Sequence, residues 1–340
     1  MQETTQNDAV RFLLPRPVQP HKPLFVFLPG MDGSGTLLET QLNSLGPCFD
    51  LRCLSIPPQD ETGWTRLTRQ VVQLIRDEIS RAADAATTSA ATTSAATASA
   101  ATTSAATTSA ATALSDRSVS GEAGFATGRK KLGANKLRLP KLKSQRSPQK
   151  PQKRVRRSVY LCGESFGGCL AMHVLTHAPE LFDRVILINP ASSFRRLPWM
   201  QLGQMITQRL PSNVYRYGAL GLVPFLIDPF RVARRDRKAL EKAMDAVPPK
   251  TAAWRMSLLS RFEVERLPLE RMAHPVLLVA GGSDRLLPSQ REVRDLGRRF
   301  PNAQQHLLPK SGHACLLEQG VNLQKIMRQY EFIPADLSLE

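Results

Sequence analysis

Short apolar runs recur along the chain, and most of them end at glycine or proline. Apolar runs of about four to eight residues between such turn residues are typical of strands buried on both faces of a parallel sheet. They predict strands at 24–28, 51–56, 159–162, 184–188 and 275–280, and the pattern over 304–308 predicts a last one. Apolar positions at helical spacing predict helices over 65–83, 169–175 and 289–299, and a closing helix from Ala314. This alternation favours an α/β fold with a mostly parallel sheet.

Two stretches interrupt the alternation of strands and helices. Residues 85–113 contain almost only Ala, Thr and Ser, and without large apolar side chains such a stretch cannot offset the entropy lost on ordering. We therefore expect residues 85–153 to be one disordered insertion. Residues 195–268 instead contain many Met, Trp, Phe and Leu side chains, and they predict a helical lid packed on the body. The core would then consist of 1–84 and the rest of 154–340.

The net charge of +17 would first suggest a nucleic-acid partner, but its distribution changes that interpretation. Residues 129–157 carry thirteen Lys and Arg and no Asp or Glu, and subtracting these thirteen leaves about +4 for the remaining chain. The charge thus belongs to one segment, and we do not expect nucleic acid to be a partner. The segment is interpreted as a solvated loop, with contact to an anionic membrane surface as the alternative.

Cysteine usage and the chain's first residues bear on the cellular compartment. The five cysteines are odd in number and show no C-x-x-C spacing, which argues against a disulfide framework and against a zinc site. The longest apolar run, 218–227, is shorter than the ~20 residues that span a bilayer. Residues 1–20 lack the apolar core of a secretory signal. These features predict a protein that is neither secreted nor membrane-spanning, and otherwise cytoplasmic.

The clearest chemical motif is Gly163-Glu-Ser-Phe-Gly167, which lies between a predicted strand and a predicted helix. This is the G-x-S-x-G pattern of a nucleophile elbow, a sharp turn that exposes the serine hydroxyl. Glycine is wanted two positions before and after the serine, because side chains there would collide with the crowded strand and helix. We therefore predict Ser165 as a nucleophile. The backbone amide of Phe166, at the start of the helix, is predicted as one donor of an oxyanion hole.

A glycine-rich loop, residues 29–35, follows the first buried strand. It lacks the Lys-Ser/Thr of a P-loop and does not match G-x-G-x-x-G, so we reject nucleotide binding and expect neither a cofactor nor a metal. In hydrolases that carry a nucleophile elbow, a loop at this place supplies the second oxyanion amide. We predict the amide of Met31 for that role, with a simple turn as the alternative.

Two further residues follow predicted strands, at the edge where parallel α/β sheets place their active sites. They are Asp284 and His313, and with Ser165 they give the chain order nucleophile, acid, base of hydrolases. Histidine titrates near neutral pH, so His313 is suited to take the serine proton. Asp284 would orient the imidazole. Asp228, in the predicted lid, is the alternative acid.

Five stretches resemble the α/β-hydrolase superfamily and, more narrowly, the esterase/lipase/thioesterase-type domain of plant and algal phytyl ester synthases. They are 28–35, 163–171, 189–194, 284–290 and 311–318. The resemblance implies an α/β-hydrolase fold with a mostly parallel sheet, helices on both faces and a helical lid insertion. It implies that nucleophile, acid and base fall on Ser165, Asp284 and His313. Because such enzymes move fatty acyl groups onto phytol or diacylglycerol in plastids, it also implies a chloroplast location and an acyl lipid or acyl thioester substrate.

Two functions from different classes follow. The first is a serine-dependent acyl ester or thioester hydrolase, or an O-acyltransferase, that works through an acyl-enzyme. The sequence lacks the H-x-x-x-x-D motif of the second acyltransferase domain found in many phytyl ester synthases, so plain hydrolysis gains weight over acyl transfer to a lipid alcohol. The second is a non-catalytic ligand-binding protein on the same scaffold, because a fold does not fix a function.

Overall fold

The computed structural model describes residues 9–84, 156–198, 200, 207 and 221–334. The predicted insertion at 85–153 and part of the predicted lid at 195–268 lie outside these described residues.

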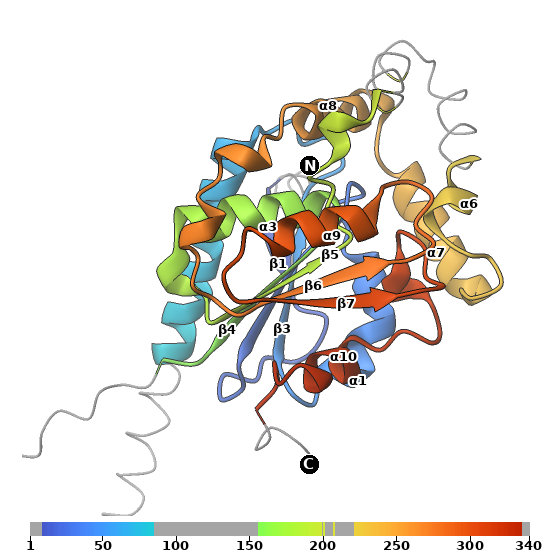
Figure 1. The fold of residues 1–340 in the computed structure, drawn as a ribbon. Helices are drawn as coiled ribbons and strands as arrows, with labels where there is room; N and C mark the ends of the chain where they lie inside the picture. The colour runs from blue at the N-terminus through green and yellow to red at the C-terminus, as the bar shows by residue number, and fades with distance from the viewer. Residues whose placement is uncertain (1–8, 85–155, 199, 201–206, 208–220, 335–340) are drawn as a thin grey trace, which may run out of the picture. The chain divides into compact units, whose positions relative to one another are not determined.

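Within the described residues, seven strands form one sheet in the order β1-β3-β2-β4-β5-β6-β7 (Figure 1). They are β1 (Arg11–Leu13), β2 (Leu24–Leu28), β3 (Asp50–Ser55), β4 (Val159–Glu164), β5 (Arg184–Ile188), β6 (Val276–Gly281) and β7 (Ala303–Leu308). Every neighbouring pair is parallel except β1 with β3. The mostly parallel α/β fold is thus confirmed. The sequence analysis missed β1, because three residues are too few to show a period.

Helices cover both faces of the sheet (Figure 1). A helix over 64–84, α3 (Phe166–His177) and α9 (Ser289–Gly297) lie on one face, and α1 (Leu42–Leu45) and α10 (Leu323–Gln329) lie on the other. Strand β2 shows why its sequence is apolar throughout. Its alternate residues enter two different hydrophobic cores, so all five side chains are buried.

The end of the chain corrects one prediction. The helix expected from Ala314 is instead a 3-10 turn, Cys315–Leu317, and α10 begins only at Leu323. Two polar contacts account for the difference. Glu318 turns its carboxylate back to accept the amide of Gly312 at 2.8 Å, and the Asn322 side chain caps α10 by accepting the amide of Lys325 at 2.9 Å.

A buried charge network lies at the start of β3. Arg52, 2% exposed, donates to Asp50 at 2.7 Å and to Glu78 at 2.6 Å. Arg157 donates to the same Asp50 carboxylate at 2.7 Å and to the carbonyl of Glu78 at 3.2 Å. Burial alone would raise the pKa of Asp50, but the hydrogen bonds from both arginines and the amide of Gln19 hold that pKa below its usual value. The chain on either side of residues 85–155 is therefore fixed at one place.

The chain between β5 and β6 is largely helical where it is described. It contains a short turn at Phe194–Arg196, then α6 (Val223–Leu226), α7 (Arg234–Asp245) and α8 (Pro249–Ser260), followed by turns at Val264–Arg266 and Leu269–Arg271. In Figure 1, α6 and α7 lie beyond the carboxyl ends of β6 and β7. The role of this segment as a lid stays a prediction. No described helix is both long enough and apolar enough to cross a membrane.

Candidate active site

Ser165 occupies a sharp turn between β4 and α3. Its backbone angles are φ 53° and ψ −115°, a conformation that non-glycine residues rarely adopt and that costs on the order of 1–3 kcal/mol. A Cβ atom on Gly163 would lie 2.3 Å from the carbonyl oxygen of Gly167, and one on Gly167 would lie 2.0 Å from that of Leu28. Both positions require glycine for the reason that the motif predicts.

The structure brings the three predicted catalytic side chains into direct contact. Ser165 Oγ lies 2.9 Å from Nε2 of His313, and Nδ1 of His313 lies 2.8 Å from Oδ2 of Asp284. The side chains of His313 and Asp284 are 5% and 1% exposed, so this chain of hydrogen bonds is shielded from water. The alternative acid, Asp228, instead accepts the amide of Phe230 at 2.9 Å in an exposed turn. The geometry is that of a nucleophile, a base and an orienting carboxylate.

Asp284 is held as an ionised hydrogen-bond acceptor. Burial alone would raise its pKa, but the charge interaction and hydrogen bond with His313, the Ser289 hydroxyl and the Leu287 amide together hold that pKa below its usual value. The Leu286 and Leu287 amides reach Oδ1 at 2.8 and 3.0 Å, while Ser289 donates to Oδ2. The loop before α9 thus fixes Oδ1, while Oδ2 is shared between the first residue of α9 and the imidazole.

The loop that carries His313 is fixed by two buried side chains from elsewhere in the chain. Glu318, 1% exposed, accepts the hydroxyl of Ser311 at 2.9 Å as well as the amide of Gly312. Asn189, fully buried at the end of β5, donates to the carbonyl of His313 at 2.6 Å. The Asn189 side-chain oxygen accepts the amide of Gly281 at 2.7 Å, which ties this loop to the end of β6.

Glu164 directly precedes the nucleophile and is also buried, at 1% exposure. Neither of its carboxyl oxygens has a hydrogen-bond partner among the described residues, and burial raises its pKa well above the usual value. Burial thus favours the neutral form of this carboxyl group, which works against a second negative charge beside Ser165.

The predicted oxyanion loop lies against the elbow. A Cβ atom on Gly30 would lie 3.8 Å from Cβ of Ser165, so Met31 follows immediately after a residue in contact with the nucleophile. Phe166 is the first residue of α3, and the first amides of a helix have no acceptor within the helix. Phe166 thus follows Ser165 directly, and the residue before Met31 lies close to Ser165, so the amide of Met31 as the second donor stays a prediction.

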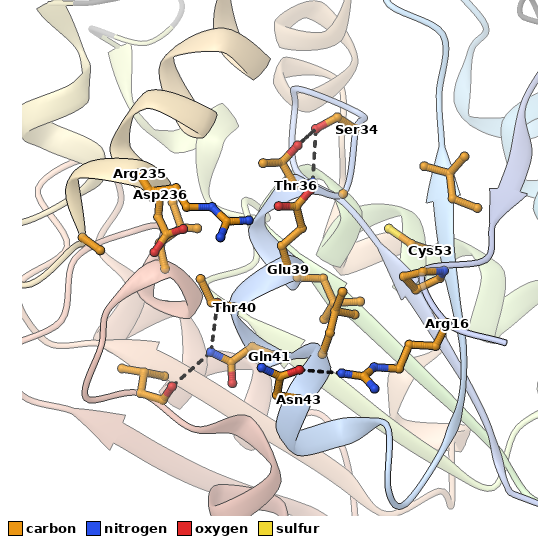
Figure 2. Close-up of a pocket in the computed structure, with 18 of the residues that line it drawn as sticks. Arg16, Ser34, Thr36, Glu39, Thr40, Gln41, Asn43, Cys53, Arg235 and Asp236 are labelled. Carbon is orange, nitrogen blue, oxygen red and sulfur yellow. Dashed lines mark hydrogen bonds between the residues drawn. The ribbon is translucent and has the colours of Figure 1, made fainter.

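A cavity of about 1080 Å³ lies beside the same loop (Figure 2). Its lining includes Ser34 of the glycine-rich loop, Thr36 and Glu39 of the turn that follows, and charged side chains from other parts of the chain, among them Arg16 and Arg235. None of the three triad residues lines it. Its size alone does not make it the reaction site, because the three predicted catalytic side chains do not line it.

No cluster of three or more His, Cys, Asp or Glu side chains in the described part of the chain is arranged to hold a metal ion. All five cysteines belong to the described residues, none of them forms a disulfide, and all are buried. Burial raises the pKa of Cys162, Cys169 and Cys315 well above the usual value, so these thiols are poor nucleophiles.

A second buried carboxylate gives a pH prediction. Glu292, 3% exposed, accepts the hydroxyls of Ser192 and Ser193 beside a cavity of about 200 Å³. Burial raises its pKa from 4.5 to about 7, although the serine hydrogen bonds oppose the shift. The pKa of Glu292 is thus higher in the folded state than in the unfolded state. Between pH 4.5 and about pH 7, the unfolded state therefore binds fewer protons than the folded state. The free energy of unfolding contributed by this group should therefore fall as pH rises through that window.

Replacing Glu292 with glutamine should remove this pH dependence. Relative to the unmodified protein, Glu292→Gln should gain stability between pH 5 and pH 8, by up to about 3 kcal/mol. Urea unfolding of both proteins at pH 5, 6, 7 and 8 measures the difference. A difference that stays constant over this range would contradict the prediction.

The sheet and the elbow together define an enzyme of the α/β-hydrolase type, and comparison with known proteins agrees. The model of the Hydrolase_4 family, described as serine aminopeptidase, S33, matches residues 143–320, more than half of the chain. The chain therefore belongs to this family.

Two curated relatives are informative. The chain is 26% identical to phytyl ester synthase 1, chloroplastic, of Arabidopsis thaliana, over 92% of this chain and 37% of the relative. It is 26% identical to pimeloyl-[acyl-carrier protein] methyl ester esterase of Vibrio parahaemolyticus, over 46% of this chain and 64% of that protein. The chain thus spans little more than a third of the length of the synthase. Family and relatives together indicate hydrolase or esterase-type activity.

A solved structure shows the same fold. The hydrolase olei00960 of Oleispira antarctica superposes with a TM-score of 0.59 at 12% identity, covering 96% of each chain. At this identity the similarity concerns the fold alone.

Proposed function

We propose that the protein is a serine-dependent acyl hydrolase or O-acyltransferase that works through an acyl-enzyme. The observation that carries the proposal is the Ser165–His313–Asp284 contact, with Oγ 2.9 Å from Nε2 and Nδ1 2.8 Å from Oδ2. A serine hydroxyl is a weak nucleophile until a base removes its proton, and this arrangement supplies such a base with its second nitrogen oriented by a carboxylate.

In the first half of the reaction, Ser165 Oγ attacks the carbonyl carbon of an ester or thioester while its proton passes to Nε2 of His313. The carbonyl oxygen becomes an oxyanion, which the amides of Phe166 and Met31 would hold. When the tetrahedral intermediate collapses, the alcohol or thiol leaves with the proton from His313. The acyl group stays on Ser165. Asp284 stabilises the imidazolium that forms in between.

In the second half, His313 takes a proton from an acceptor whose oxygen attacks the acyl-enzyme. Water gives a free acid, and an alcohol gives a new ester. Similarity to phytyl ester synthase 1 over 92% of this chain supports acyl lipids or acyl thioesters as donors and phytol or diacylglycerol as acceptors. The same similarity supports a chloroplast location. Contact of the basic stretch, 129–157, with an anionic membrane surface is a further proposal, and it concerns residues mostly outside those described.

A fluorophosphonate probe tests the nucleophile. The purified protein should become covalently labelled at Ser165, and mass spectrometry of the digested protein should locate the adduct. Ser44→Ala is the control. Ser44 lies in α1, on the face of the sheet opposite α3, and its hydroxyl donates to the carbonyl of Gln41. Ser44→Ala should be labelled at the same rate. If Ser165 is not labelled, the non-catalytic ligand-binding interpretation is favoured.

Product analysis tests the acceptor. The protein is incubated with an acyl-CoA or a galactolipid, with and without phytol, and lipids are separated and quantified. Phytyl ester that accumulates only with phytol supports acyl transfer, whereas free acid at equal rates in both reactions supports hydrolysis.

A further inference from the structure

Arg255 belongs to α8, in the segment predicted to form the lid, yet its side chain is buried at 2% exposure. The guanidinium donates from Nη1 to the carbonyl of Met31 at 2.5 Å and from Nη2 to the carbonyl of Pro57 at 2.8 Å. Arginine is almost never fully buried unless strong hydrogen bonds match its charge. One of the two carbonyls that accept from Arg255 belongs to Met31, a predicted oxyanion residue.

Met31 is the second residue of a turn whose ends are joined by a hydrogen bond from the Gly33 amide to the Gly30 carbonyl at 3.0 Å. The amide N–H of Met31 and the carbonyl of Gly30 belong to one planar trans peptide and point in opposite directions. Gly30 also lies beside Ser165. The Met31 amide therefore moves with this turn as a whole, because its own peptide carries the carbonyl that closes the turn.

The central peptide of such a turn has two common orientations. A type II turn requires positive φ at the third residue, and a type I turn does not. The third residue here is Asp32, and it is not among the described non-glycine residues with positive φ. The carbonyl that reverses direction between the two turn types is that of Met31, the acceptor for Arg255, and it belongs to the Met31–Asp32 peptide. The guanidinium therefore holds this peptide in one orientation. The N–H of Met31 lies in the preceding peptide, whose carbonyl closes the turn, so Arg255 acts on it only by holding the turn in place.

Helix α8 also contacts Trp64, whose ring packs against Phe166, the other predicted oxyanion residue. Trp64 Nε1 donates to the carbonyl of Leu258 in α8 at 3.0 Å. Its ring stacks on that of Phe166, with centroids 4.7 Å apart and an interplanar angle of 25°. Helix α8 is thus linked by one side chain to the Met31 turn and by another to Phe166.

We propose that Arg255 is a positioning residue that holds the Gly30–Gly33 turn with the Met31 amide beside Ser165, so that oxyanion stabilisation depends on the seating of α8. The inference rests on the proposed acyl-enzyme function and extends it. It assigns to the predicted lid a second role beyond covering the substrate, because the placement of one of its helices sets the geometry of the oxyanion hole.

The test replaces Arg255 with methionine, which fills similar space but donates no hydrogen bond. Loss of one whole oxyanion donor costs ~10²–10³ in kcat, so a misaligned donor should cost ~10- to 100-fold with KM nearly unchanged. A trifluoromethyl ketone, whose adduct with Ser165 carries an oxyanion, should bind more weakly by the factor that kcat/KM loses. If Arg255 only stabilised the fold, Arg255→Met would lower the melting temperature, but inhibitor affinity and kcat/KM would not fall by the same factor.

Arg261 provides the matched control. It lies at the end of the same helix, is exposed, and donates to the carbonyl and hydroxyl of Ser257. Arg261→Met should leave kcat and inhibitor affinity within about twofold, as is usual for surface substitutions. A folded Arg255→Met variant with wild-type kcat and inhibitor affinity, or one whose loss is confined to KM, would overturn the inference.

If Arg255→Met does not fold, Arg255→Lys decides. Lysine keeps the charge but cannot present two N–H groups in a fixed fork, so kcat should fall while KM stays. Wild-type kcat and inhibitor affinity in Arg255→Lys would overturn the inference. Fluorophosphonate labelling of the unmodified protein separates this outcome from the parent proposal. If Ser165 is labelled and Arg255 has no effect, only the inference falls, whereas without labelling both fall.

Discussion

Replacing Ser165 with alanine should reduce kcat for ester hydrolysis by about 10⁴-fold or more, because removal of a triad nucleophile leaves only binding and oxyanion stabilisation. The substitution removes only the Oγ atom. Alanine keeps the Cβ atom, so the backbone strain at this position is the same in both proteins. We therefore expect little change in thermal stability. Hydrolysis of a short p-nitrophenyl ester, measured beside the melting temperature, gives both quantities.

Ser44→Ala again serves as the control and should retain activity. Contaminating esterases are excluded by carrying out the same purification on both variants. If a folded Ser165→Ala variant keeps substantial activity, the acyl-enzyme proposal is wrong.

Replacing Asp284 with asparagine should reduce kcat by about 10⁴-fold, although the side chain keeps its size. The carboxylate accepts a hydrogen bond from Nδ1–H of His313 at 2.8 Å, which keeps the proton on Nδ1 and leaves Nε2 free to accept the proton of Ser165. An amide that presents its NH₂ group to Nδ1 would favour the other tautomer. KM should change little, since Asp284 lies behind the imidazole and not beside the substrate.

Asp228 offers a matched comparison, because the sequence alone leaves it as an alternative acid. It accepts a backbone amide in an exposed turn, so Asp228→Asn should lower kcat by less than about threefold, as for other surface changes. Steady-state kinetics of both variants decide between them. A large loss in Asp228→Asn with activity retained in Asp284→Asn would contradict the assignment.

The sequence was most informative where local pattern and local structure coincide. The strand at 24–28 is apolar throughout because both faces of β2 are buried, and the elbow glycines are required by contacts within the turn and with Leu28. Ser165, Asp284 and His313 could be proposed because each follows a strand in a parallel sheet. Their mutual distances could not be derived from spacing, and only the structure gives them.

The supporting side chains could not be found in this way. The partners of Asn189 and Arg255 lie more than 100 residues away, and Glu318 bonds back across a turn to Gly312. The residues next to a polar side chain in the sequence do not indicate which carbonyl or amide it will contact. Their burial could have been a signal only after the fold was known. The closing helix was misplaced for the same reason, since the turn of Glu318 toward Gly312 depends on a tertiary contact.

The charge network at the start of β3 bears on how this chain could change in length. Arg157 touches both Asp50 and Glu78, so the described segments on either side of residues 85–155 are joined by direct contacts. These contacts lie at the amino end of β4, whereas Ser165 follows its carboxyl end. Residues could therefore be gained or lost between Glu78 and Arg157 without altering the distance from the helix over 64–84 to Ser165. The length of this interval could change in evolution while the arrangement of the three predicted catalytic side chains stays the same.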